Sequence, residues 1–141
     1  MPEKEIELTV CGSVGNLETR LSIPEASPNG VAFLSHPHPL FGGNMNNKVI
    51  HTLNKTFLQE NWITIRHNFR GVGKSQGTYD NGRGETEDLL TLVKYFLSLP
   101  EIRALFPNEP KICFSGFSFG TYVSCKAAFS FARHCSRKVE I

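Results

Sequence analysis

The stretch 111–120, KICFSGFSFG, decides the fold of this chain. Residues 111–114 read as a short strand that runs directly into the pattern Gly-x-Ser-x-Gly at positions 116–120. Apolar residues then recur over 121–131 in a way that suits a helix. A strand, a tight turn carrying a serine, and a helix place the serine hydroxyl on an exposed bend above a sheet. The pattern therefore predicts that Ser118 is a nucleophile.

The composition limits the class of protein. A length of 141 residues indicates one domain, 1–141, and 40% hydrophobic residues with eleven Phe are enough for a core. A net charge of +2 with both signs scattered gives no argument for nucleic acid as a partner. Apolar runs fall short of the roughly 18 residues of a membrane span, so no membrane is expected either.

The cysteines and the first residues point to a cellular compartment. Four cysteines without C-x-x-C spacing predict free thiols in a reducing environment, and neither a disulfide framework nor a zinc site. The first five residues, MPEKE, do not resemble a secretory signal. We expect a cytoplasmic protein.

The order of strands and helices predicts the fold class. Alternating apolar residues over 6–10 and 17–23, with a turn at Gly15-Asn16, predict an antiparallel hairpin. Strands are expected at 31–34 and 62–66, a helix capped by Asn44 over 44–57, and a second helix from about Gly84 until Pro100. Alternation of this kind predicts an α/β fold with a mostly parallel sheet and helices on both faces, preceded by the amino-terminal hairpin.

The glycine-rich segment 70–77 superficially resembles a phosphate-binding loop. In that motif a glycine stands five residues before Gly73, but the residue here is Asn68. The dinucleotide pattern fails too, because its third glycine would be Gln76. We expect this tight loop to shape one wall of a cleft.

The segment HPHPLFGG, 36–43, lies between an apolar strand and a helix, where ligands bind in open sheets. His36 and His38 have the spacing of metal ligands, but the next twenty residues contain no Cys, Asp or Glu, so we expect no metal. No cofactor is expected. An oxyanion hole needs two backbone N–H groups, and the residue after the serine, Phe119, would supply one. The other would come from His38, Leu40 or Phe41, because prolines have no N–H; if only the backbone donates, the His38 side chain should be dispensable.

Three blocks together resemble the α/β-hydrolase superfamily: 116–120, 36–48 and 68–77, in the same order and spacing. The similarity covers essentially the whole chain, and it is greatest to small, lidless predicted hydrolases near the serine aminopeptidase-like and dienelactone hydrolase-like domains. The resemblance implies a serine hydrolase that acts on a small-molecule ester, thioester or amide through an acyl-enzyme on Ser118. It also implies Phe119 N–H as one oxyanion donor and the loop from His38 to Phe41 as the source of the other.

The resemblance also implies an acid and a histidine after the nucleophile, and here the chain departs from it. Only 23 residues follow Ser118, and they contain one acid, Glu140, and one histidine, His134. A helix from the serine to His134 would separate the two by about 24 Å. We therefore expect the amino-terminal two thirds of such a domain, with doubtful activity.

Two consequences of this departure remain open. His36 or His38 is a conceivable substitute base, and the alternative function is a non-catalytic fragment or pseudoenzyme that binds a carbonyl ligand or a partner chain. The pattern of 138–141 resembles the opening of a next strand, so the strand 111–114 should be an exposed sheet edge, open to self-association.

Overall fold

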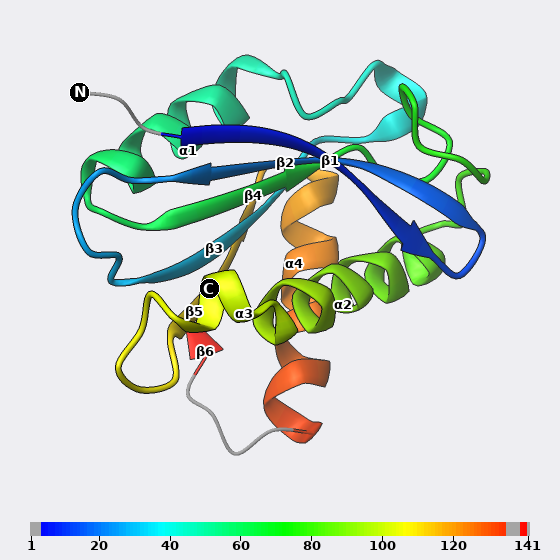
Figure 1. Cartoon of the computed structure of the whole chain (residues 1–141). Coiled ribbons are helices and arrows are strands. Elements are labelled where there is room, and N and C mark those ends of the chain that lie inside the picture. Colours follow the sequence, from blue (N-terminus) through cyan, green and yellow to red (C-terminus); the bar gives the residue numbers. More distant parts are fainter. Residues whose placement is uncertain (1–3, 135–138, 141) are drawn as a thin grey trace.

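The computed structural model describes residues 4–134 and 139–140, which form one six-stranded sheet with helices on both faces (Figure 1). The strand order is β1-β2-β4-β3-β5-β6. The strands are β1 (Lys4–Gly12), β2 (Gly15–Ile23), β3 (Gly30–Ser35), β4 (Ile63–His67), β5 (Lys111–Gly116) and β6 (Val139–Glu140). The helices are η1 (Pro39–Phe41), α1 (Lys48–Gln59), α2 (Arg83–Ser98), α3 (Pro100–Arg103) and α4 (Phe119–His134).

The sheet is antiparallel at its amino-terminal side and parallel elsewhere. β2 pairs antiparallel with both β1 and β4, whereas β4, β3, β5 and β6 run parallel. The predicted hairpin is confirmed, but its turn was placed wrongly. Gly12 pairs with Gly15, so the turn is Ser13-Val14 and Gly15-Asn16 already belongs to β2.

The start of α1 also differs from the prediction. The helix is capped by Asn47, whose Oδ1 accepts hydrogen bonds from the N–H groups of Val49 and Ile50. Asn44 instead closes a local turn by accepting from the Asn46 N–H at 2.8 Å. Asn and Asp favour both roles, so their presence alone does not say which one begins the helix. Met45 is buried ahead of the helix, and its N–H donates to Asn68 Oδ1 at 2.9 Å.

Two apolar layers hold the helices against the sheet. On one face α2 and α4 cover the larger cluster, in which the most voluminous fully buried side chains include Phe33, Phe69, Phe96 and Phe114. On the other face α1 covers a smaller cluster of Ala32, Leu34, Ile50 and Cys113. The expected helices on both faces are therefore confirmed (Figure 1). No helix in the described part of the chain is long and apolar enough to cross a membrane.

The far side of the sheet corrects one expectation. β6 runs parallel to β5, with Ile112 opposite Val139 and Cys113 opposite Glu140. The strand preceding Ser118 is therefore not the outermost strand, and the next strand that the sequence suggested is present at 139–140. Lys138 and Ile141, the other residues of that expected strand, lie outside the described residues.

Candidate active site

Ser118 occupies a strained turn between β5 and α4. Its φ is 60°, in the left-handed region that few residues other than glycine adopt, and its side chain is exposed. A residue held in this region costs about 1–3 kcal/mol, which the surrounding structure must offset. The carbonyl of Ser118 accepts the N–H of Thr121 at 2.9 Å, so the serine is fixed to the first turn of α4.

Two glycines allow the turn to lie close to the neighbouring strand. A Cβ on Gly120 would overlap the carbonyl groups of Ser35 and His36, and a Cβ on Gly116 would lie 2.6 Å from the Gly120 oxygen. The Phe117 N–H donates to the Ser35 carbonyl at 3.2 Å. The Gly-x-Ser-x-Gly spacing therefore follows from the close contact of β5, β3 and α4.

The N–H of Phe119 is available at the start of α4. It belongs to the first residue of the helix, where N–H groups have no intrahelical partner, and no described group accepts it. The helix macrodipole adds a partial positive charge at this end. The position suits an oxyanion.

The loop after β3 contains the other expected donors. His38 accepts three backbone bonds: Leu40 N–H to its Nδ1 at 3.1 Å, and the N–H groups of Phe41 and Gly43 to its carbonyl at 3.1 and 3.0 Å. The N–H groups of Leu40 and Phe41 are thus already engaged. Among the three candidates only the N–H of His38 has no acceptor in the described structure.

His36 holds the loop after β3 in place through hydrogen bonds at both ring nitrogens. Its Nδ1 donates to the Pro37 carbonyl at 2.7 Å, and its Nε2 accepts the Phe69 N–H at 3.0 Å. The side chain is fully buried. Burial lowers the pKa of His36 to about 4, although the hydrogen bond to Pro37 acts to raise it. His36 is a neutral structural residue whose two nitrogens are both occupied.

The rings of His38, His51 and His67 make no hydrogen bond to Ser118 in the described structure. The ring of His38 is bonded at both nitrogens, to Leu40 N–H and to the Tyr79 hydroxyl. His67 is buried in β4, and burial together with the nearby His36 lowers the pKa of His67 to about 3. His51 is exposed on α1, across the sheet from α4, and His134 ends α4.

The glycine-rich loop is fastened to β2 through residues that the sequence did not single out. Glu18 Oε1 accepts the Asn68 side-chain amide and the Lys74 N–H, both at 2.8 Å, and Ser75 Oγ bonds both Asn68 and Glu18 backbone groups. Burial raises the pKa of Glu18, but these two hydrogen bonds and the charges of Lys74 and Arg20 outweigh it, and the pKa is lowered. An isolated glutamate in a strand carries no sequence signal, so only the structure reveals this contact.

A groove separates this loop from the loop after β3. It has a volume of about 790 Å³, and its walls are 71–74 on one side and Pro39, Gly42 and Gly43 on the other. The glycine-rich loop thus forms a cleft wall, as the sequence predicted. Asn44, Asn46 and Asn68 are among the polar residues that line the groove.

Metal ligands do not gather in the described part of the chain. No three His, Cys, Asp or Glu side chains among residues 4–134 and 139–140 lie close enough to share an ion. His36 and His38, which have ligand spacing in the sequence, are each bonded to other groups.

Comparison with known proteins places this geometry in context. No family model matches the chain. An uncharacterised protein of Rickettsia prowazekii is 39% identical over 114 residues, which cover 80% of this chain and 45% of that protein. An α/β serine hydrolase homologue from Coxiella burnetii superposes with a TM-score of 0.80 and 41% identity, over 89% of this chain and 57% of that one.

A second solved structure is a lidless α/β serine hydrolase from Xanthomonas campestris. It has a TM-score of 0.80 and 34% identity, and the match covers 94% of this chain and 59% of that one. The chain thus spans about half the length of these relatives. The matches confirm the resemblance inferred from the three sequence blocks.

Proposed function

From the α/β-hydrolase fold of this chain and its similarity to lidless serine hydrolases, we propose that it is a hydrolase-type protein that forms an acyl-enzyme on Ser118. The substrate class is a small-molecule ester, thioester or amide. The observation that carries the proposal is the exposed Ser118 at φ 60°, directly followed by the unengaged Phe119 N–H.

The chemistry follows from this pair. Ser118 Oγ attacks the carbonyl carbon, a C–O bond forms, and the carbonyl π electrons move onto the oxygen as an oxyanion. Collapse expels an alcohol, thiol or amine, and water then releases the acid from the serine. Phe119 N–H and His38 N–H are the proposed oxyanion donors. Leu40 and Phe41 would first have to give up their bonds to His38.

The proton of Ser118 has no dedicated acceptor in the described part of the chain. His36 and His38 have both ring nitrogens engaged, and His134 stands at the opposite end of α4, about 24 Å along the helix. Among the described residues solvent is left to take the proton, so catalysis by these residues rests on the oxyanion hole and binding. Such sites retain roughly a thousandfold acceleration over water.

The lack of a base for Ser118 among the described residues favours a second candidate function. A site that has oxyanion donors but no base among the described residues binds a carbonyl compound more readily than it turns it over. The chain would then be a non-catalytic binder of a carbonyl ligand or of a partner chain. The polar groove along 71–74 would hold the rest of the ligand.

Acyl-enzyme formation with p-nitrophenyl acetate separates the two functions. The hydrolase proposal predicts slow release of p-nitrophenol and an acetylated peptide containing Ser118, both lost in Ser118→Ala. Ser98→Ala, on the exposed end of α2, is the matched control and should react like the original chain. Acetylation of another serine would contradict the assignment of the nucleophile. A chain that binds the ester without releasing p-nitrophenol would support the non-catalytic alternative.

A further inference from the structure

The imidazole of His38 is bonded at both ring nitrogens, and these bonds fix its tautomer. Nδ1 lies 3.1 Å from the Leu40 backbone nitrogen, and Nε2 lies 3.1 Å from the Tyr79 hydroxyl. A backbone N–H can only donate, so Nδ1 must be the unprotonated nitrogen. The neutral ring therefore carries its proton on Nε2 and donates it to Tyr79.

The same ring packs against three separate segments of the chain. Its centroid lies 4.8 Å from that of Phe41, 5.0 Å from Tyr79 and 4.7 Å from Phe119. Tyr79 and Phe119 are themselves 5.8 Å apart. His38 thus joins the loop after β3, the segment before α2 and the first residue of α4, which are the segments around Ser118.

We propose that His38 and Tyr79 are positioning residues: the Leu40 N–H sets the Nε2–H tautomer, the Tyr79 hydroxyl accepts that Nε2–H and holds the ring, and the ring then caps the turn Pro39–Phe41 and orients the His38 N–H toward the oxyanion site. For its catalytic consequence the inference rests on the function proposed above. The cap itself does not depend on it. The ring of His38 acts through its own backbone and touches no reacting atom.

Substitutions can separate the cap from the ring. Asn at position 38 offers a side-chain oxygen that can accept the Leu40 N–H, as Asn44 does for Asn46 and Asn47 does for Val49. This cap does not titrate. Tyr79→Phe keeps the aromatic ring and deletes the hydroxyl. Tyr122→Phe is the matched control, because Tyr122 lies half-exposed on α4 and its hydroxyl has no partner in the described structure.

The test is nuclear magnetic resonance on the intact chain. At pH 8 the imidazole ¹⁵N shifts of His38 should show the proton on Nε2. The protection factor of the Leu40 amide against hydrogen exchange should fall about tenfold in His38→Ala and in Tyr79→Phe, and should keep its original value in His38→Asn and in Tyr122→Phe.

Labelling by a fluorophosphonate gives the catalytic readout. The rate at which the fluorophosphonate labels Ser118 should fall in His38→Ala and return to its original value in His38→Asn. A proton on Nδ1 at pH 8, or Leu40 protection that is the same in His38→Ala as in the original chain, would overturn the inference. The tautomer and the Leu40 protection do not involve Ser118, so an unreactive serine with the expected tautomer and protection contradicts only the proposed function.

Discussion

Gly120, the second residue of α4, touches the backbone of Ser35, the last residue of β3, so closely that a methyl group at position 120 would overlap the Ser35 carbonyl. That carbonyl also accepts the Phe117 N–H at 3.2 Å. One backbone group thus sets both the height of α4 above the sheet and the bend that exposes Ser118.

Gly120→Ala should therefore damage the turn at Ser118. The added methyl meets backbone and not a flexible side chain, so α4 must shift, at a cost of about 2–4 kcal/mol in the free energy of unfolding. Gly42→Ala is the control: φ is +82° but the space is open, and the cost should be about 1 kcal/mol. Urea unfolding of both variants measures the difference, and equal costs would contradict the packing argument.

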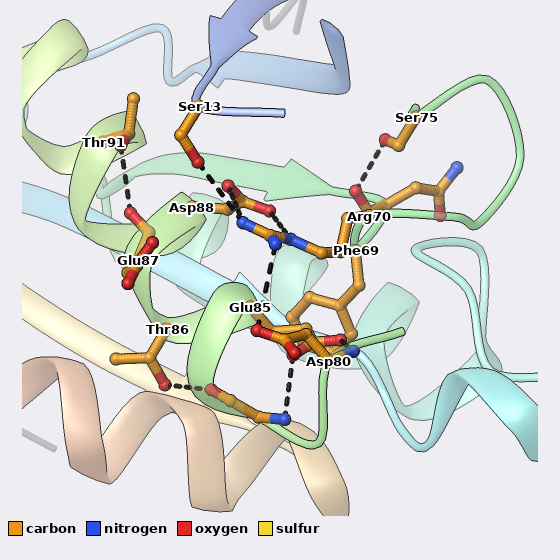
Figure 2. A network of polar contacts seen from close by, with 12 residues as sticks. Ser13, Phe69, Arg70, Ser75, Asp80, Glu85, Thr86, Glu87, Asp88 and Thr91 are labelled. Atoms are coloured by element: carbon orange, nitrogen blue, oxygen red, sulfur yellow. Dashed lines mark hydrogen bonds and ion pairs between the residues drawn. The ribbon is translucent and has the colours of Figure 1, made fainter. Parts of the chain in front are cut away.

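Arg70 and Asp88 form a buried bidentate pair behind the glycine-rich loop (Figure 2). Arg70 Nε and Nη2 donate to the two Asp88 oxygens at 2.7 and 2.9 Å, and the side chains are 7% and 1% exposed. The bond to Asp88 raises the pKa of Arg70, so the guanidinium remains charged.

Removing one partner of this pair should be worse than removing both. Asp88→Leu leaves a buried guanidinium without its carboxylate, which costs about 3–5 kcal/mol, whereas Arg70→Met with Asp88→Leu should recover a large part of that loss. The unfolding free energies of the two single variants and the double variant measure the coupling. A loss in the double variant equal to the sum of the two single losses would show that Arg70 and Asp88 do not stabilise the fold as a coupled pair.

The buried histidines should make the fold sensitive to mild acid. The pKa of His36 is about 4 in the folded chain and about 6.5 in a model peptide, so between these values the unfolded chain binds a proton that the folded chain does not. Stability should therefore fall as pH falls below 6.5, by about 1.4 kcal/mol per pH unit for each such histidine. Burial lowers the pKa of His67 as well, so His67 adds to the same loss of stability.

Urea unfolding at pH 7 and pH 5.5 measures this slope. The carboxyl of Glu18 has its pKa lowered and loses its contribution only at more acidic pH, so it does not interfere in this window. His36→Gln, which keeps a donor and an acceptor but does not titrate, should reduce the slope. A free energy of unfolding that is constant from pH 7 to 5.5 would contradict the burial of both imidazoles.

Glu18 should control the order of the glycine-rich loop. Glu18→Ala removes the acceptor of the Asn68 amide and of the Lys74 N–H, and leaves a buried amide unpaired at a cost of about 1–3 kcal/mol. We expect faster tryptic cleavage after Lys74. Glu7→Ala, on the neighbouring strand with a 74% exposed side chain, is the control and should leave the cleavage rate unchanged. If trypsin cleaves Glu18→Ala and Glu7→Ala at the same rate, contacts other than those of Glu18 keep the loop ordered.

The backbone of the fold could be predicted from local signals. The strand and helix around Ser118, the hairpin and the alternating elements between them each leave either a periodic apolar pattern or a short apolar run, and the structure confirms them. The turns were less predictable, because several residues near each turn can play the same local role. Ser13-Val14 forms the turn that Gly15-Asn16 was expected to form, and Asn47 forms the cap expected of Asn44.

The turn that holds the candidate nucleophile could be located from the sequence, but the contacts around it could not. Gly-x-Ser-x-Gly marked Ser118 and the following N–H, because the spacing itself encodes the tight turn. Which loop N–H groups are free depends on hydrogen bonds from the side chain and carbonyl of His38 to residues two to five positions later, and these appear only in the structure. The sequence predicts that the His38 side chain is dispensable if only its backbone donates, and it gives no sign that the ring is bonded to Tyr79, 41 residues away in the chain.

The central claim is that Ser118 is the residue that reacts with a carbonyl or its analogue. Fluorophosphonate labelling of the 141-residue chain, followed by peptide mapping, tests it most directly. We predict slow labelling confined to Ser118 and absent from Ser118→Ala, with Ser98→Ala labelled at the original rate. Labelling of a different serine, or no labelling of a chain that unfolds cooperatively, would contradict the claim.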